Sequence, residues 1–376
     1  MRDLFMLDPG VVFLNHGSFG ACPGPVFERY QAWQLELERE PVEFIVRRLP
    51  ELLAEARAAL AAYVGAAAED LAFVQNATTG VNMAARSLDL QPGDEVLATG
   101  LEYGACDLAW EAICARAGAR YVRAEMTLPV GDVVEALFAR QTERTRVVYA
   151  SHITSATAVL LPIEEIVRRA RDAGLVTIVD GAHAPAHVPL DLEALGADFY
   201  AGNCHKWLCA PKGAGFLHVR PERQERVEGP IVSWGHTKPS TFVSRTQEQG
   251  TRDAAAYLTV PDAIAFQEER AWADVRARCV DLCREARRDL CDVLGTEPIA
   301  PEEMVLQMAS VRLPDGVGKA LARSLWDDHR IEIPIMRPQE DLLRISIAAY
   351  TTREDVERLL DALPRALAIP RNPTGL

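Results

Sequence analysis

The residue with the clearest chemical potential is Lys206, in the stretch FYAGNCHKWLCAPKGAGFLHV at residues 199–219. An apolar, strand-like run precedes it, and small and aromatic residues flank it. Lysines usually lie on hydrated surfaces. Two interpretations therefore stand open: a surface charge after a strand, or a reactive amine in a partly dry pocket. In such a pocket a lysine loses its proton and acts as nucleophile or base.

Four further segments place polar residues at or just after strand ends. NATTGVN (76–82) opens a helix, where small and hydroxyl residues bind a phosphate or simply cap the helix. LEYGA contains Tyr103, SHITSAT contains Ser155, and VTIVDGAHAP contains Asp180 and His183. A carboxylate after a buried strand needs a partner. That partner is a protonated ring nitrogen, a Mg²⁺ ion or a helix start, and the chain has no GxxxxGK loop to accompany magnesium.

These five segments together describe a site for pyridoxal phosphate. An amine forms an imine with the cofactor aldehyde, and a carboxylate keeps the pyridine nitrogen protonated, so that the ring accepts electrons. A helix start binds the phosphate, and an aromatic side chain covers one face of the ring. Each signal is weak alone, and their joint occurrence in this order indicates the cofactor.

The elements that must position these residues alternate between strand and helix. Seven strand-like runs lie between residues 71 and 219, with helical stretches between several of them. This alternation predicts an α/β fold with a mainly parallel seven-stranded sheet flanked by helices, and ligands bind beyond the carboxyl ends of such strands. We expect a large domain at 21–254 and a smaller α+β domain from 1–20 and 255–376. Helices are expected over 25–64 and 257–294.

Composition restricts the partners. The chain has 376 residues and a formal net charge of −14, which disfavours nucleic acid and anionic membranes as partners. No apolar stretch is long enough to span a membrane, and no set of residues has metal-ligand spacing. The eight cysteines are scattered, and the N-terminus lacks a signal-peptide pattern. We therefore expect free thiols and a cytoplasmic location.

The stretch from Val179 to Arg220 strongly resembles the class V aminotransferase-like enzymes of pyridoxal phosphate fold type I. Within that family the chain is most similar to isopenicillin N epimerase-like proteins. LNHGSFG, EPVEFIVRRLP, LEYGA and VSWGH fit that subgroup as well, so the resemblance covers nearly the whole chain. It implies a fold type I transferase with pyridoxal phosphate as cofactor.

The resemblance also implies roles for particular residues. Lys206 would bind the cofactor and shuttle the proton, Asp180 would pair with the pyridine nitrogen, and Tyr103 would stack on the ring. His183 and Ser155 would contact the phenolic oxygen. The residues implied for the phosphate are Ala77, Thr78, Asn203 and His205, with Thr79 as a weaker candidate and Thr251 reaching the neighbouring subunit of a homodimer with a shared active site. Those implied for the substrate are Arg344, which would grip an α-carboxylate, and Asn15 and His16.

The resemblance favours an epimerase or racemase that acts at Cα of a small amino acid. A C–S lyase that works by β-elimination, and an aminotransferase, remain open on the same scaffold. A persulfide-forming desulfurase is disfavoured, because no cysteine lies between His329 and Arg344. A non-catalytic binding protein is disfavoured as well, since both Lys206 and Asp180 are present. Inversion needs a second proton carrier, for which His16, Tyr103 and His236 are candidates.

Overall fold

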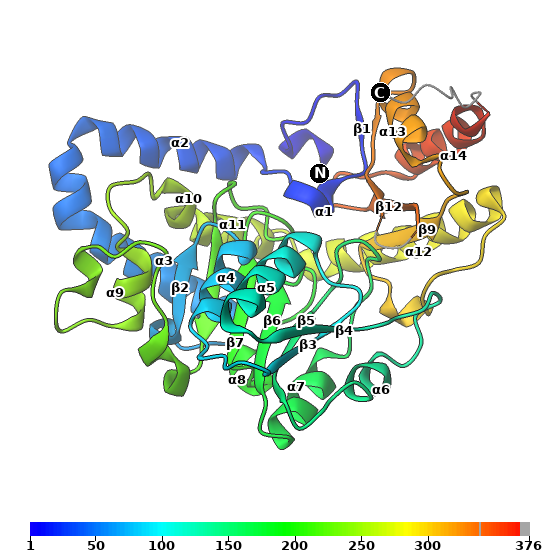
Figure 1. The fold of residues 1–376 in the computed structure, drawn as a ribbon. Coiled ribbons are helices and arrows are strands. Elements are labelled where there is room, and N and C mark those ends of the chain that lie inside the picture. Colours follow the sequence, from blue (N-terminus) through cyan, green and yellow to red (C-terminus); the bar gives the residue numbers. More distant parts are fainter. Residues whose placement is uncertain (338–339, 369–376) are drawn as a thin grey trace.

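The fold is built around one large sheet. The computed structural model describes residues 1–337 and 340–368. Its central sheet has seven strands in the spatial order β2-β8-β7-β6-β5-β3-β4 (Figure 1). They are β2 (Leu71–Val74), β3 (Glu95–Thr99), β4 (Arg120–Ala124), β5 (Thr145–Ser151), β6 (Val176–Gly181), β7 (Phe199–Asn203) and β8 (Gly215–Val219). Within this sheet β8 is antiparallel to β2 and β7, and the other pairings are parallel. The predicted mainly parallel sheet is confirmed.

Helices cover both faces of the sheet. Because successive strand residues point to opposite sides, each strand contributes side chains to two cores. In β5, Val147 and Tyr149 join a core with Trp110, whereas Val148 and Ala150 belong to the core on the other face. Helices α4 (Ala77–Arg86) and α5 (Gly104–Ala117) supply the first core. Helices α3 (Leu49–Val64), α6 (Val133–Phe138), α7 (Ile163–Asp172) and α11 (Val260–Glu268) supply the second. Near-continuous apolar strands are typical of a sheet covered on both sides.

A smaller part of the chain packs beside the sheet, at the upper right of Figure 1. It contains a three-stranded sheet in the order β11-β12-β9 and a parallel pair of β1 with β10. The strands are β1 (Val12–Phe13), β9 (Met308–Arg312), β10 (Ile331–Glu332), β11 (Ile335–Met336) and β12 (Leu342–Ser346), and the helices are α12 (Trp272–Leu294), α13 (Gly318–Asp327) and α14 (Arg353–Leu367). The pairing of β1 with β10 attaches the N-terminal segment to this part. The exact domain boundary at residue 254 stays a prediction.

The sequence predicts two long continuous helices, over 25–64 and 257–294. Both predictions are wrong, because each segment is interrupted. The first is divided into α2 (Gly24–Arg39), the π-helix η2 (Glu43–Arg48) and α3, with Pro41 in the break. The second is divided into α10 (Ala255–Leu258), α11 and α12, and Ala271 has a left-handed φ of 47° just before α12 begins. Pro261 lies in the first turn of α11, where its missing N–H costs no hydrogen bond. The remaining elements are α1 (His16–Phe19), α8 (Leu192–Leu195), α9 (Phe242–Gln247), η1 (Arg2–Leu4), η3 (Ala68–Asp70), η4 (Pro221–Arg226), η5 (Trp234–His236) and η6 (Glu302–Met304).

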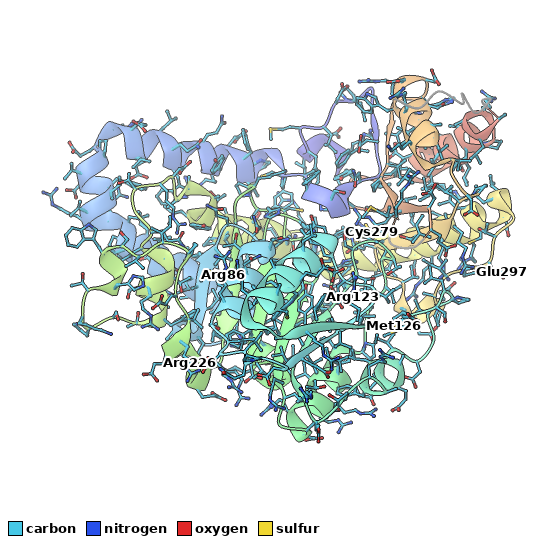
Figure 2. All side chains as sticks on the ribbon, in the orientation of Figure 1. Arg86, Arg123, Met126, Arg226, Cys279 and Glu297 are labelled. Carbon is cyan, nitrogen blue, oxygen red and sulfur yellow. The ribbon has the colours of Figure 1, made fainter. Side chains whose placement is uncertain are left out.

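The carboxyl ends of β2, β3, β5, β6 and β7 lie at one edge of the sheet, because these five strands run in the same direction. The five segments singled out in the sequence follow these five ends. Exposed charged side chains such as those of Arg226 and Glu297 lie on the outside of the molecule (Figure 2). The topology therefore brings residues more than a hundred positions apart to one place.

Candidate active site

A cavity of about 710 Å³ lies at this edge of the sheet. It is lined by residues from all five strand ends, from α1 and from β11 and β12. Nine residues predicted from the sequence line it: Thr78, Tyr103, Ser155, Asp180, His183, Asn203, His205, Lys206 and Arg344. A cavity of this size has room for a cofactor together with a substrate.

Lys206 follows the end of β7, and its amine faces His183. The Lys206 Nζ atom lies 3.2 Å from His183 Nε2, and the Lys206 carbonyl oxygen lies 3.0 Å from His16 Nε2. Burial and the positive charge of Arg344 together lower the pKa of Lys206 to about 7, although the charge of Asp180 opposes both effects. A lysine with this pKa is about half uncharged near neutral pH, and the uncharged amine is a nucleophile.

The ring of His183 is oriented by Trp207. Trp207 Nε1 donates to His183 Nδ1 at 3.4 Å, so the neutral ring carries its proton on Nε2. Burial lowers the pKa of His183 well below its usual value, which keeps the ring neutral. His183 Nε2 then donates to Lys206 Nζ, which can accept only as an uncharged amine. The hydrogen bonds and the burial thus favour the same neutral state of Lys206.

Asp180 is the second-to-last residue of β6, and its side chain is buried. Its Oδ1 atom accepts from the Ala182 amide at 2.9 Å, and its Oδ2 atom accepts from the Tyr149 hydroxyl at 3.3 Å. The Cys106 thiol lies 3.6 Å from Oδ2. Burial raises the pKa of Asp180. A buried carboxyl without an ion pair within hydrogen-bonding reach fits a cationic partner such as a protonated pyridine nitrogen.

The first turn of α4 lines another side of the cavity. The Asn76 side chain accepts from the amide and the hydroxyl of Thr79 at 2.9 and 3.1 Å, and the Ala77 amide donates to Asn203 Oδ1 at 2.8 Å. Thr78 lines the cavity in the first turn of α4, where backbone amides have no partner in a preceding turn of the helix. Free donors at a helix N-terminus fit an anion such as phosphate.

His205 lines the same end of the cavity in a neutral state. Its Nδ1 atom donates to the Ala214 carbonyl at 3.0 Å, and burial lowers its pKa to about 4. The Nε2 atom of this neutral ring is an acceptor. It can therefore donate to a phosphate only after protonation, which a nearby dianion favours by raising the pKa.

Arg344 enters the cavity from β12 and is only 1% exposed. Its Nη1 atom donates to the Ser155 carbonyl at 2.7 Å and to Ser155 Oγ at 3.3 Å, and its Nη2 atom donates to Ser18 Oγ at 2.8 Å. Its buried Nε atom has no partner among the described residues. Burial lowers the pKa of Arg344 to about 10, so it stays charged at neutral pH. A buried guanidinium without a carboxylate partner fits the carboxylate of a bound substrate.

Five predicted residues do not line the cavity. His16 is buried, and both of its ring nitrogens are engaged: Nδ1 lies 3.0 Å from the Tyr350 hydroxyl, and Nε2 lies against Lys206. Asn15 donates to Glu332 at 2.8 Å and accepts from Ser18. Ala77 donates to Asn203 at the end of β7, and Thr79 donates to Asn76, which caps α4. Thr251 is exposed next to the lining residue Arg252. The roles proposed for these five residues stay predictions; His16 contacts the backbone of Lys206, and Asn15 contacts the side chain of Ser18.

Sequence reasoning missed several cavity residues. Ser18 lies within the LNHGSFG segment, Lys212 within the stretch at residues 199–219, and Arg252 next to Thr251, so the sequence pointed to these segments but not to these three residues. Glu102, directly before Tyr103, does not line the cavity, but it is buried beneath it and accepts from the lining residue Ser151 Oγ at 2.6 Å and from Thr99 Oγ1. Burial raises its pKa to about 8. A charged residue between a strand and a helix was the only available signal for Glu102.

In the part of the chain that the structure describes, no group of three or more His, Cys, Asp or Glu side chains is placed to hold a metal ion. No described helix is long and apolar enough to cross a membrane. All eight cysteines are buried and free, and none of them lines the main cavity.

The chain is similar to curated enzymes along nearly its whole length. It is 38% identical to isopenicillin N epimerase from Streptomyces clavuligerus and 40% identical to that from Amycolatopsis lactamdurans, in each case over 96% of both chains. It is 32% identical to the putative L-cysteine desulfhydrase 2 of Oryza sativa subsp. japonica, over 96% of this chain and 85% of the relative. Both kinds of relative therefore match nearly the whole of this chain and at least 85% of their own length.

Solved structures agree in fold. The cystine C–S lyase C-DES in complex with its product cysteine persulfide has a TM-score of 0.83 and 25% identity, covering 94% of this chain and 97% of that one. A C-DES variant with glycine covalently linked to its PLP cofactor has a TM-score of 0.87. At 24% identity, over 96% and 98% of the two chains, that likeness shows the fold alone.

The family model described as Aminotransferase class-V matches residues 28–359. The predicted fold type, cofactor and family are confirmed by these similarities. The lysine, the carboxyl, the helix start and the arginine that line one cavity fit pyridoxal phosphate and an amino acid. This chain belongs to the class V aminotransferase family of pyridoxal phosphate-dependent enzymes.

Proposed function

We propose that this enzyme epimerises or racemises an amino acid at Cα. One observation carries the proposal: Lys206, whose lowered pKa favours the uncharged amine, and Arg344 line the same cavity. The Arg344 guanidinium is buried and has no carboxylate partner among the described residues. The similarity to two isopenicillin N epimerases, at 38% and 40% identity, supports this reaction over others of the family. No β-lactam substrate is assigned to this chain.

Pyridoxal phosphate, when bound, supplies an aldehyde that condenses with amines and a ring that accepts electrons. Lys206 would bind that aldehyde and, once a substrate amine replaces it, would move the Cα proton with its free Nζ atom. Asp180 would hold a proton at the ring nitrogen. Arg344 would orient the substrate through its carboxylate, and a bidentate contact of this kind fixes direction as well as affinity. Thr78 and His205 would hold the phosphate.

Inversion at Cα requires a proton donor on the face opposite Lys206. Of the three candidates from the sequence, His16 has both ring nitrogens engaged, and His236 does not line the cavity. Tyr103 lines it and is 43% exposed, so its hydroxyl can exchange protons with water. We therefore propose Tyr103 as the second proton carrier, in addition to its role of covering the ring.

The proposal is tested by incubating the holoenzyme with single enantiomers of amino acids in heavy water. We expect deuterium at Cα and recovery of both enantiomers. Lys206→Ala should abolish exchange, and Tyr103→Phe should lower enantiomer interconversion more than exchange itself. Release of keto acid and ammonia without enantiomer interconversion would refute epimerisation.

A C–S lyase is the second candidate, favoured by the similarity to L-cysteine desulfhydrases at 28–32% identity. The same proton removal by Lys206 would then be followed by loss of a β-substituent. Sulfur-substituted amino acids would yield pyruvate and ammonia. An aminotransferase, the third candidate, would require a keto-acid acceptor, so each of the three reactions has its own product.

We also propose a homodimer with shared active sites. Thr251 is exposed beside the cavity, which suits a contact with the phosphate site of a second subunit. Exposed apolar side chains at Ile231, Val232 and Trp234 lie in the segment before α9, the helix that precedes Thr251. Light scattering should show twice the mass of 41.3 kDa. Thr251→Val should weaken pyridoxal phosphate binding, whereas a monomer with unchanged cofactor affinity would contradict the proposal.

A cytoplasmic location is proposed from the free thiols, because reducing compartments keep cysteines unpaired. Cell fractionation tests it. Recovery of the protein in a secreted or periplasmic fraction would contradict it.

A further inference from the structure

Tyr149 is a buried side chain next to the active site that the proposed reaction does not use. It lies on β5, which pairs with β6, and its side chain is fully buried. Its ring lies against Trp110, with the two ring centroids 5.6 Å apart, and its hydroxyl lies 3.3 Å from Asp180 Oδ2. A buried phenol usually finds a hydrogen-bond partner. Here that partner is the carboxyl proposed to pair with the ring nitrogen of the cofactor.

The two oxygens of Asp180 receive different numbers of hydrogen bonds. Oδ2 accepts from the Tyr149 hydroxyl and from the Cys106 thiol at 3.6 Å, whereas Oδ1 accepts from the Ala182 amide at 2.9 Å. Burial raises the pKa of Tyr149 well above its usual value and also raises the pKa of Cys106, so both groups stay protonated donors. An ionised carboxylate oxygen has about two acceptor positions. Within the described ranges, Oδ2 is therefore occupied and Oδ1 keeps a position for a ligand.

Two kinds of interaction support the ionised form of Asp180 against burial, which raises its pKa. The first is the set of hydrogen bonds from Ala182, Cys106 and Tyr149, and the second is the positive charge of Lys206. Because the pKa of Lys206 is about 7, that charge is absent in about half of the molecules near neutral pH. The hydrogen bonds do not depend on the state of Lys206, so they support the carboxylate in both states.

The other titratable groups around Asp180 add little negative charge to it. Glu102, between β3 and α5, is buried, and burial together with the Asp180 charge raises its pKa to about 8, so it mainly keeps its proton at neutral pH. Tyr200 on β7 has a pKa well above its usual value, and His183 has a pKa well below its usual value. Both are therefore uncharged, and Asp180 is the acid in this layer that is left to meet a cation.

We propose that Tyr149 is a positioning residue for Asp180: its hydroxyl holds the carboxyl in the ionised form and leaves Oδ1 free to pair with the ring nitrogen of the cofactor. A hydrogen bond to the ionised form of an acid favours that form. The Tyr149 hydroxyl is the stronger of the two donors to Oδ2, because a thiol is a weak donor. The inference rests on the proposed pairing of Asp180 with the ring nitrogen, and it applies equally to each of the three candidate reactions.

The test measures how cofactor affinity changes with pH. The apoenzymes of the wild type and of Tyr149→Phe are titrated with pyridoxal phosphate and with its deaza analogue, in which a CH group replaces the ring nitrogen. Only pyridoxal phosphate can use an ionised Asp180, so the ratio of its affinity to that of the analogue falls as the pH drops through the pKa of Asp180. Loss of the hydroxyl raises that pKa, so Tyr149→Phe should move the fall to higher pH by about one unit. At the wild-type midpoint the ratio should therefore be several-fold lower in the variant.

Tyr121→Phe is the matched control. The Tyr121 hydroxyl also donates to a carboxylate, that of Asp107 on α5 at 2.6 Å, and its ring also lies against Trp110. This variant should keep the pH profile of the wild type. Cys106→Ala removes the second donor to Oδ2, and it should shift the profile in the same direction as Tyr149→Phe but by less.

An unchanged profile in Tyr149→Phe overturns the inference, and so does an equal shift in Tyr121→Phe. A loss of affinity for both ligands with their ratio kept overturns it as well, because the hydroxyl would then shape the cavity without acting on Asp180. A wild type that binds both ligands equally at every pH would refute the pairing of Asp180 with the ring nitrogen itself. Absence of Cα exchange with the shift intact would refute epimerisation but leave the role of Tyr149 standing.

Discussion

The depressed pKa of Lys206 can be measured directly in the apoenzyme. Burial and the nearby Arg344 charge lower this pKa from 10.5 to about 7. At pH 7 about half of the Lys206 amines are then uncharged, against about one in 3,000 for a lysine of ordinary pKa. The neutral amine is the reactive form, so its reactivity should reach a plateau above pH 8 and fall tenfold for each unit below pH 6.

Trace labelling with acetic anhydride provides the assay. The apoenzyme is labelled between pH 5 and 11, and the acetylation of Lys206 is quantified by mass spectrometry. We expect a midpoint near 7. Arg344→Gln should move the midpoint upward, because removing a nearby positive charge makes the ammonium form less unfavourable. The matched change Arg323→Gln at an exposed site on α13 should leave it in place.

A midpoint close to the ordinary value of lysine would refute this reasoning. It would mean that water reaches the Lys206 amine in the apoenzyme and that burial does not favour the neutral form. An unchanged midpoint in Arg344→Gln would show instead that burial acts alone. The protein without cofactor is the relevant state, since the reaction of Lys206 with the aldehyde removes the amine that is measured.

Three further predictions concern the same site. Asp180→Asn should lower pyridoxal phosphate affinity by about tenfold to a hundredfold, because hydrogen bonds to charged groups contribute about 1.5–3 kcal/mol; a cofactor titration that matches the wild type would contradict this. Arg344→Lys should raise KM for amino acids by about tenfold or more through loss of the bidentate fork, with little change expected for amines that lack a carboxylate. Trp207→Phe should raise the labelling midpoint of Lys206, because His183 Nδ1 loses its donor and the ring can then accept from an ammonium at Nε2. An unchanged midpoint in a variant of normal thermal stability would exclude that role of Trp207.

Much of the fold follows from local patterns in the sequence. Apolar runs of four to seven residues become strands because both faces of the sheet are covered, and each run ends where the next helix must begin. Asp180 and Lys206 could be placed at one sheet edge because the carboxyl ends of parallel strands coincide. The two long helices could not be divided correctly, since a left-handed residue such as Ala271 is not signalled by its type.

Only the tertiary structure decided which distant segments contact one another. The neutral state of Lys206 depends on Trp207, on His183 and on a buried arginine from residue 344, and no spacing in the sequence shows that these side chains meet. His16 looked like a cavity residue, yet its ring nitrogens face a backbone carbonyl and a tyrosine hydroxyl. Residue types and strand ends thus determine which chemistry is possible, whereas long-range packing determines which atoms face one another.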